Sequence, residues 1–91
     1  MYQSSRYNEY LNVSGKKIKE FRLKSKLSLS ALSIRLGLMG IDIPKQSLYK
    51  IETGQRTLKD FELCALAYIL KISMEDLMED FILEIHKEEI I

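Results

Sequence analysis

The chain of 91 residues is the size of one domain, and its composition, 46% hydrophobic and 30% charged, is that of an ordinary globular protein. It contains no apolar run long enough to span a membrane and no signal-peptide core at its start, so we expect a cytoplasmic protein. The single cysteine, Cys64, excludes an internal disulfide, and its apolar neighbours predict a small buried side chain.

The net charge of +1 hides an uneven distribution of charged residues. Residues 1–59 carry twelve basic and four acidic side chains, a net charge of +8, whereas residues 60–91 carry two basic and nine acidic ones, a net charge of −7. A basic N-terminal part suits contact with a polyanion, while an acidic C-terminal part would stay away from it. Two solvated faces without a partner are the alternative interpretation.

The chain begins with a polar lead and a first helix. Residues 1–13 form a Tyr-containing lead, which would either pack on the core or flank a bound polyanion. Ser14 is a good N-cap for a helix over about residues 15–25.

A second helix is predicted to run from Ser28 or Leu29 to Leu36, where Gly37 would close it in a left-handed conformation. The connection that follows, residues 38–43, is long for a tight helix-turn-helix. We expect its two isoleucines to anchor it to the core.

Pro44 can start a third helix, because its missing N–H would be unpaired in the first turn anyway. Leu48 and Ile51, spaced i and i+3, would form the inner face of this helix. Gly54 would close it.

Two further helices complete the prediction. A helix from about Lys59 or Asp60 to Leu70 carries an apolar stripe at helical spacing. Ser73 would cap a fifth helix, whose apolar face continues toward the end of the chain. This face is formed by Met74, Leu77, Met78, Phe81, Ile82 and Ile85. No strand pattern competes, so the sequence predicts an all-α protein.

The second and third helices are two short helices joined by a turn, an arrangement that suits insertion of the third helix into a DNA major groove. Its outer face would carry four candidate base-reading side chains, Lys45, Gln46, Tyr49 and Lys50. Lysine can donate to guanine O6 and N7, and glutamine can bond bidentately to adenine. Tyrosine can donate to phosphate or pack against a thymine methyl. A merely solvated helix face is the alternative.

Nothing in the sequence predicts catalysis. The single histidine, His86, lies in an acidic terminal helix without an evident nucleophile or metal co-ligand. The paired carboxylates are sequence neighbours, which diverge by about 100° on a helix. The sequence has no phosphate-binding glycine loop and no Cys/His zinc spacing, so we expect no enzyme, no cofactor and no metal site.

The ordered set of motifs over residues 14–78 resembles the phage repressor and Cro family of helix-turn-helix proteins, the XRE-like group. The matching residues are Gly15, Ile18, Arg22, Leu27, Ser28, Leu32, Leu48, Ile51, Glu52, Thr53, Gly54, Gln55, Arg56, Leu63, Leu66, Ala67, Leu70 and residues 73–77. The resemblance implies a five-helix bundle of the lambda-repressor-like DNA-binding type with an extended C-terminal helix. It implies a transcriptional regulator that binds specific sequences of double-stranded DNA and reads them with its third helix. A repressor is the expected kind of regulator. Residues 14–78 would be the helix-turn-helix domain, preceded by the lead of residues 1–13 and followed by the extension of residues 79–91.

The resemblance also implies roles for residues at both ends of the third helix. Candidate phosphate contacts are Ser28, Ser30, Ser47, Thr53, Gln55 and Arg56. An ion pair between Arg22 and Glu52 would tie the first helix to the end of the third, with an effect on stability and not on base readout.

The chain departs from the family pattern in three places. Leu29 stands where the family often has a glutamine that touches phosphate, and leucine cannot make that contact. Pro44 replaces the usual Ser or Thr cap. The turn between the second and third helices is about four residues longer than the common form. The insertion would either present residues 39–42 to the DNA backbone or bulge into solvent, and we expect the second because Asp42 would be unfavourable near phosphates.

A single module of this kind reads a short footprint, so we expect a homodimer on two half-sites about 34 Å apart. The candidate dimerisation element is the C-terminal helix, through Met78, Phe81, Ile82 and Ile85. The alternative for this face is folding back on the N-terminal lead. A function from another class also stays open: an antitoxin-like or anti-repressor protein-interaction module on the same fold, with a protein partner at the C-terminal helix.

Overall fold

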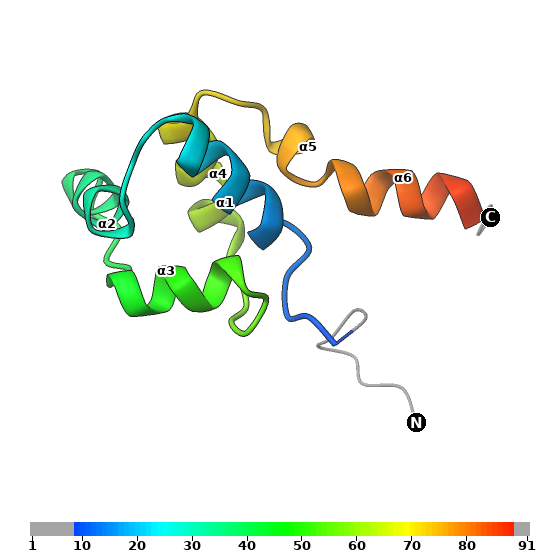
Figure 1. The fold of residues 1–91 in the computed structure, drawn as a ribbon, viewed down its shortest axis with the longest axis horizontal. Coiled ribbons are helices and arrows are strands. Elements are labelled where there is room, and N and C mark those ends of the chain that lie inside the picture. Colours follow the sequence, from blue (N-terminus) through cyan, green and yellow to red (C-terminus); the bar gives the residue numbers. More distant parts are fainter. Residues whose placement is uncertain (1–8, 89–91) are drawn as a thin grey trace.

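The computed structural model describes residues 9–88, and the six elements within them are all α-helices (Figure 1). They are α1 (Gly15–Lys24), α2 (Leu29–Leu38), α3 (Lys45–Glu52), α4 (Asp60–Leu70), α5 (Met74–Leu77) and α6 (Glu79–Glu88). The all-α prediction is confirmed. Most of the predicted lead, residues 1–8, and the end of the predicted extension, residues 89–91, lie outside the described residues.

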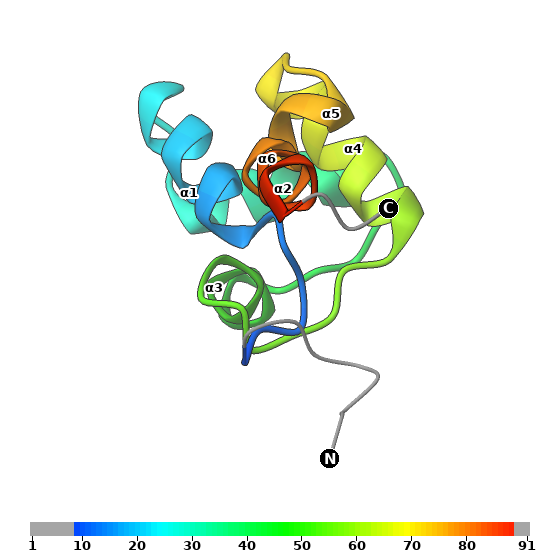
Figure 2. The same cartoon turned by 90° about the vertical axis from the view of Figure 1, so that its right-hand side faces the viewer.

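Side chains from α1 to α5 meet in one core. The side chains with 0% exposed area are Ile18, Leu32, Leu36, Leu48, Ile51, Leu66 and Leu77. Their spacing within each helix follows the helical repeat, so each helix turns one apolar stripe inward. Figure 2, which looks along α6, shows α1 and α4 on opposite sides of the molecule, with α3 below them.

The end of α2 differs from the prediction. The helix continues to Leu38, so the predicted closure at Gly37 is wrong, and Gly40 takes the left-handed conformation with φ +82°. The N–H of Ile41 donates to the carbonyl of Leu36 at 3.0 Å, and the N–H of Gly40 donates to that of Gly37 at 3.0 Å. This double closure is a Schellman motif, which carries Ile41 back onto the core.

The long connection is anchored as predicted. Ile43 is 1% exposed, and Ile41 packs against the core, whereas Asp42 is exposed. The hydroxyl of Ser33 in α2 donates to the carbonyl of Ile43 at 2.7 Å. These contacts fix the point at which α3 begins.

The predicted fifth helix is two helices, because the chain breaks at Met78, with φ −106° and ψ 11°. The break lets Leu77 reach the core while α6 projects from the body of the molecule (Figure 1). Lys17 of α1 forms an ion pair with Glu79 at 3.2 Å, which holds the first turn of α6. The hydrogen bond to Glu79 raises the pKa of Lys17.

The prediction that Cys64 is buried is wrong, because its side chain is exposed. Phe61 and Tyr68, three residues before and four after it, are 54% and 76% exposed. α4 has more apolar residues than the core can bury. Cys64, Phe61 and Tyr68 lie on the face of the helix that points to solvent.

The start of α1 is capped in an unexpected way. Ser14 occupies the N-cap position, as predicted, but its side chain makes no capping hydrogen bond. The side-chain oxygen of Asn12 instead accepts from the backbone N–H groups of Ser14 and Gly15, at 3.0 and 2.7 Å. The described end of the lead, residues 9–13, therefore takes part in the fold of the domain through Asn12.

Candidate nucleic-acid interface

α3 separates an apolar inner face from a polar outer face. Leu48 and Ile51 point into the core, and Pro44 starts the helix from an extended backbone, with φ −64° and ψ 159°. The opposite face presents four exposed side chains, Lys45, Gln46, Tyr49 and Lys50. All four predicted base-reading residues therefore lie together on the outside of one helix, whose inner side is fixed by the core.

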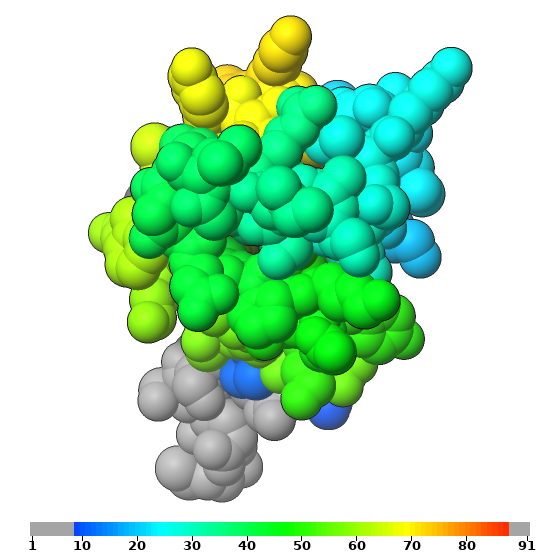
Figure 3. All heavy atoms as spheres, turned by 90° about the vertical axis from the view of Figure 1, so that its left-hand side faces the viewer, coloured from blue at the N-terminus to red at the C-terminus, as the bar shows by residue number. Residues whose placement is uncertain are grey.

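A cleft lies between the N-terminal end of α2 and the outer face of α3. It has a volume of about 600 Å³ and is lined by Arg22, Ser28, Leu29, Ser30, Lys45, Gln46, Tyr49 and Lys50. Figure 3 shows α2 and α3 side by side on one face of the molecule. The structure thus brings two of the predicted phosphate contacts, Ser28 and Ser30, next to the predicted base readers.

Ser28 is the N-cap of α2, which begins at Leu29, within the predicted range. Its side-chain oxygen accepts a hydrogen bond of 3.0 Å from the N–H of Ala31. Because the hydroxyl acts as an acceptor in the cap, its proton is the part that it can offer to a phosphate. Ser47, a further predicted phosphate contact, is half-buried on α3.

The remaining predicted phosphate contacts lie beyond the C-terminal end of α3. Gly54 takes the left-handed conformation, with φ +78°, and closes the helix as predicted. The Thr53 hydroxyl donates to the carbonyl of Tyr49 at 3.0 Å, and the Gln55 amide donates to the Thr53 hydroxyl at 2.7 Å. The loop is thus folded on itself by its own side chains.

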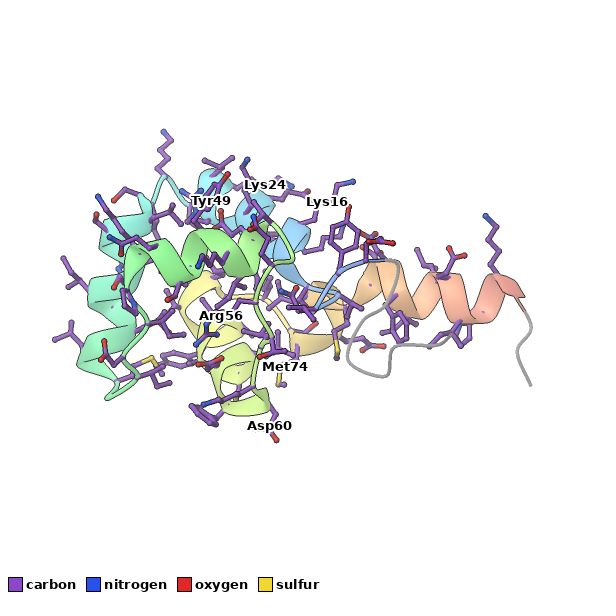
Figure 4. The ribbon with its side chains drawn as sticks, turned by 90° about the horizontal axis from the view of Figure 1, so that it is seen from below. Lys16, Lys24, Tyr49, Arg56, Asp60 and Met74 are labelled. Atoms are coloured by element: carbon purple, nitrogen blue, oxygen red, sulfur yellow. The ribbon has the colours of Figure 1, made fainter. Side chains whose placement is uncertain are left out.

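Arg56 is held by a carboxylate that sequence reasoning missed. Its guanidinium donates to both oxygens of Glu62, at 3.0 and 3.2 Å, and Glu62 is only 4% exposed. Figure 4 shows Arg56 and Tyr49 on opposite sides of α3. The signal for Glu62 is its place as the third residue of α4, where a carboxylate can accept the N–H of Lys59, here at 3.0 Å.

Burial opposes ionisation of Glu62, but hydrogen bonds from Arg56 and from the backbone of Lys59 outweigh it, so the pKa of this carboxyl lies below its ordinary value of 4.5. Glu62 is therefore ionised at neutral pH. Its charge partly neutralises Arg56, whose guanidinium faces the protein as well as the solvent.

Arg22 and Glu52 form a buried ion pair. The guanidinium donates to the two carboxylate oxygens at 2.6 and 3.0 Å, and it also donates to the carbonyl of Leu27 at 2.8 Å. The pair connects α1 to the last residue of α3. It is the ion pair that the resemblance implied.

The described residues hold no group of three His, Cys, Asp or Glu side chains that could bind a metal ion. None of the helices in that part of the chain has the length and apolar character needed to cross a membrane. His86 is exposed on α6.

A family model described as helix-turn-helix matches residues 18–77, which is more than half of the chain. The match begins within α1, includes all of α2, α3 and α4, and ends with α5, so α6 lies outside it. Comparison with curated proteins and with solved structures found no match.

Proposed function

Because the chain belongs to the helix-turn-helix family of phage repressors and Cro, a DNA-binding regulatory family, we propose that it reads specific double-stranded DNA sequences with α3 in the major groove. The observation that carries the proposal is the division of α3 into a buried and an exposed face. An α-helix fits the major groove, which is about 12 Å wide. Since the core fixes the inner side of α3, the outer side chains can enter that groove without local unfolding.

The four exposed residues of α3 supply the chemistry of base recognition. Lys45 and Gln46 lie in the first turn, which in this docking geometry comes closest to the base edges. Lys45 and Lys50 would donate to guanine O6 and N7, and Gln46 would bond to adenine N6 and N7. Tyr49 would donate to a phosphate or pack against a thymine methyl.

Phosphate contacts at both ends of α3 would set its register on the duplex. Ser28, Ser30 and Ser47 would contact one strand near the N-terminal end of α2, where the helix dipole also favours an anion. Thr53, Gln55 and Arg56 would contact the other strand. Since Glu62 already takes part of the charge of Arg56, the contribution of Arg56 to phosphate binding is smaller than that of an unpaired arginine.

We propose that the regulator is a repressor. Occupation of an operator is sufficient to exclude other proteins from the same groove, and it requires only the DNA-reading module. We also propose a cytoplasmic location, because a regulator of this family acts on DNA inside the cell.

α6 is the proposed dimerisation element. It projects from the body (Figure 1), and its apolar stripe consists of three half-buried side chains, Phe81, Ile82 and Ile85, whereas Met78, which precedes α6, packs against the core. A cleft of about 620 Å³ opens between α6, the lead and the end of α3, and Phe81 lines it. A second copy related by a two-fold axis would cover the stripe and place two α3 helices for half-sites about 34 Å apart. The lead of the same chain is the alternative partner for this face.

The acidic, apolar character of α6 also favours a second candidate function, an antitoxin-like or anti-repressor module that binds a protein partner through α6. The two functions can coexist on one fold. A gene for a toxin-like or protease-like protein beside this one would favour the second.

Selection of bound duplexes from a randomised pool tests the proposed function. We expect enrichment of a two-fold symmetric site, with an affinity that falls steeply as the salt concentration rises. Absence of any salt-dependent affinity for duplex DNA would contradict the proposal.

A further inference from the structure

The side chain of Asn12 joins three separate parts of the fold. Its oxygen accepts the N–H groups of Ser14 and Gly15, which begin α1. Its amide nitrogen donates to the carbonyl of Ile51 in α3 and to that of Arg56 in the loop beyond, both at 2.9 Å. One carboxamide therefore holds the start of α1, the end of α3 and the following loop in a fixed relation.

The residues just before Asn12 reinforce this connection. The N–H of Leu11 donates to the carbonyl of Gly54 at 2.8 Å. The ring of Tyr10 lies so close to Gly54 that a Cβ at that position would collide with it. The segment Tyr10–Asn12 thus lies along the turn that closes α3.

We propose that Asn12 is a positioning residue for base readout, an inference that rests on the proposed function. α3 has only eight residues, so the placement of its C-terminal end sets the angle of the whole helix in a groove. Ile51 is in the last turn of α3, where its carbonyl accepts the N–H of Gly54 at 3.1 Å, and the Asn12 amide supplies a second donor that ties it to the start of α1. Glu52, bound to Arg22 of α1, holds the same turn through its side chain.

The base-reading side chains span most of α3, so a change in its angle would displace them unequally. Bidentate hydrogen bonds to base edges require that each reading side chain is held in a precise position. A shift of about 1 Å, allowed by a missing support, is enough to weaken them. Loss of the Asn12 amide should therefore reduce discrimination between DNA sequences more than it reduces binding to DNA in general.

The substitution Asn12→Ser separates the two functions of this side chain. Serine can still accept the N–H groups at the start of α1, but it lacks the amide that reaches Ile51 and Arg56. The net charge is unchanged, so binding to an unrelated duplex should also be unchanged. We expect the ratio of affinities for the selected operator and an unrelated duplex to fall about tenfold, the size of one good base contact.

Ser73→Ala is the matched control. The Ser73 side chain accepts the N–H of Asp76 at 2.9 Å and caps α5, so its loss lowers stability without touching α3. All variants are compared at a temperature at which circular dichroism shows them folded. Ser73→Ala should keep the wild-type ratio, and an equal fall of the ratio in both variants would overturn the inference.

Should Asn12→Ser fail to fold, Asn12→Thr provides the same test, because its hydroxyl keeps an acceptor, its net charge is also unchanged and it lacks the amide donor. A folded variant with the wild-type ratio overturns the role of Asn12 and leaves the DNA-binding function intact. Failure of the wild-type protein to discriminate between duplexes would contradict both the role of Asn12 and the proposed function.

Discussion

The backbone of Gly15, at the start of α1, lies directly against the carbonyl oxygen of Ile51 in α3. A Cβ on residue 15 would collide with that oxygen and crowd the backbone of Glu52. The two helices therefore approach as closely as their backbones allow. This contact, the Arg22–Glu52 ion pair and the Asn12 hydrogen bonds all act on the last turn of α3.

Gly15→Ala should lower the free energy of unfolding by about 1–3 kcal/mol, because the added methyl group forces the two backbones apart. Denaturation in urea measures the change. Gly37→Ala is the matched control, since a Cβ at Gly37 meets nothing within 4 Å and alanine favours a helix interior by about 0.5–1 kcal/mol. Equal effects of the two substitutions would contradict the close approach of α1 and α3.

Arg22→Met should destabilise the fold by about 3 kcal/mol, because it leaves the buried carboxylate of Glu52 without its partner. Lys24→Met removes the exposed ion pair with Glu20 and should change the stability by less than about 0.5 kcal/mol. Thermal and urea unfolding of both variants measures the difference. A small effect of Arg22→Met would show that the pair is not held in the interior.

The stability of the wild-type protein should fall in acid because of Glu62. The folded-state pKa of this carboxyl lies below 4.5, so its contribution is fully present above that pH and is lost as the pH falls through the folded-state pKa. Glu62→Gln cannot titrate and should lack this part of the acid dependence. Unfolding midpoints measured from neutral pH to below 4.5 compare the two proteins, and parallel curves would count against the Arg56–Glu62 pair.

Substitution of the α6 stripe should weaken self-association. Ile82→Ser removes a central apolar side chain of the proposed interface, whereas Leu83→Ser changes the neighbouring side chain, which is 58% exposed and lies off the stripe. Sedimentation equilibrium should show a dimer for the wild type and for Leu83→Ser, and more monomer for Ile82→Ser. A monomeric wild type at high micromolar concentration, with and without operator DNA, would exclude the proposed dimer.

The helices themselves could be predicted from the sequence, because caps and apolar periods are local signals. Pro44, Gly54 and Ser73 mark helix ends where the structure has them. The choice between Gly37 and Gly40 could not be predicted in this way. It depends on whether Ile41 can pack on the core after the turn, which is a long-range contact.

The supports of the candidate interface were harder to predict than its exposed residues. The outer face of α3 follows from the helical repeat once Leu48 and Ile51 are placed inside. Asn12, in contrast, donates to carbonyl groups that are 39 and 44 positions away in the chain, and no local sequence pattern predicts these hydrogen bonds. The burial of Glu62 beneath Arg56 likewise depends on how the loop after α3 meets α4.

The affinity of Lys45→Ala and Gln46→Ala for a set of operators, each changed at one base pair, tests the central claim most directly. If the outer face of α3 reads the major groove, each variant should lose about 1–3 kcal/mol of discrimination at one base position and keep it at the others. Lys71→Ala, which removes an exposed charge beyond α4, should keep discrimination at every position. Unchanged discrimination in both α3 variants would contradict the account.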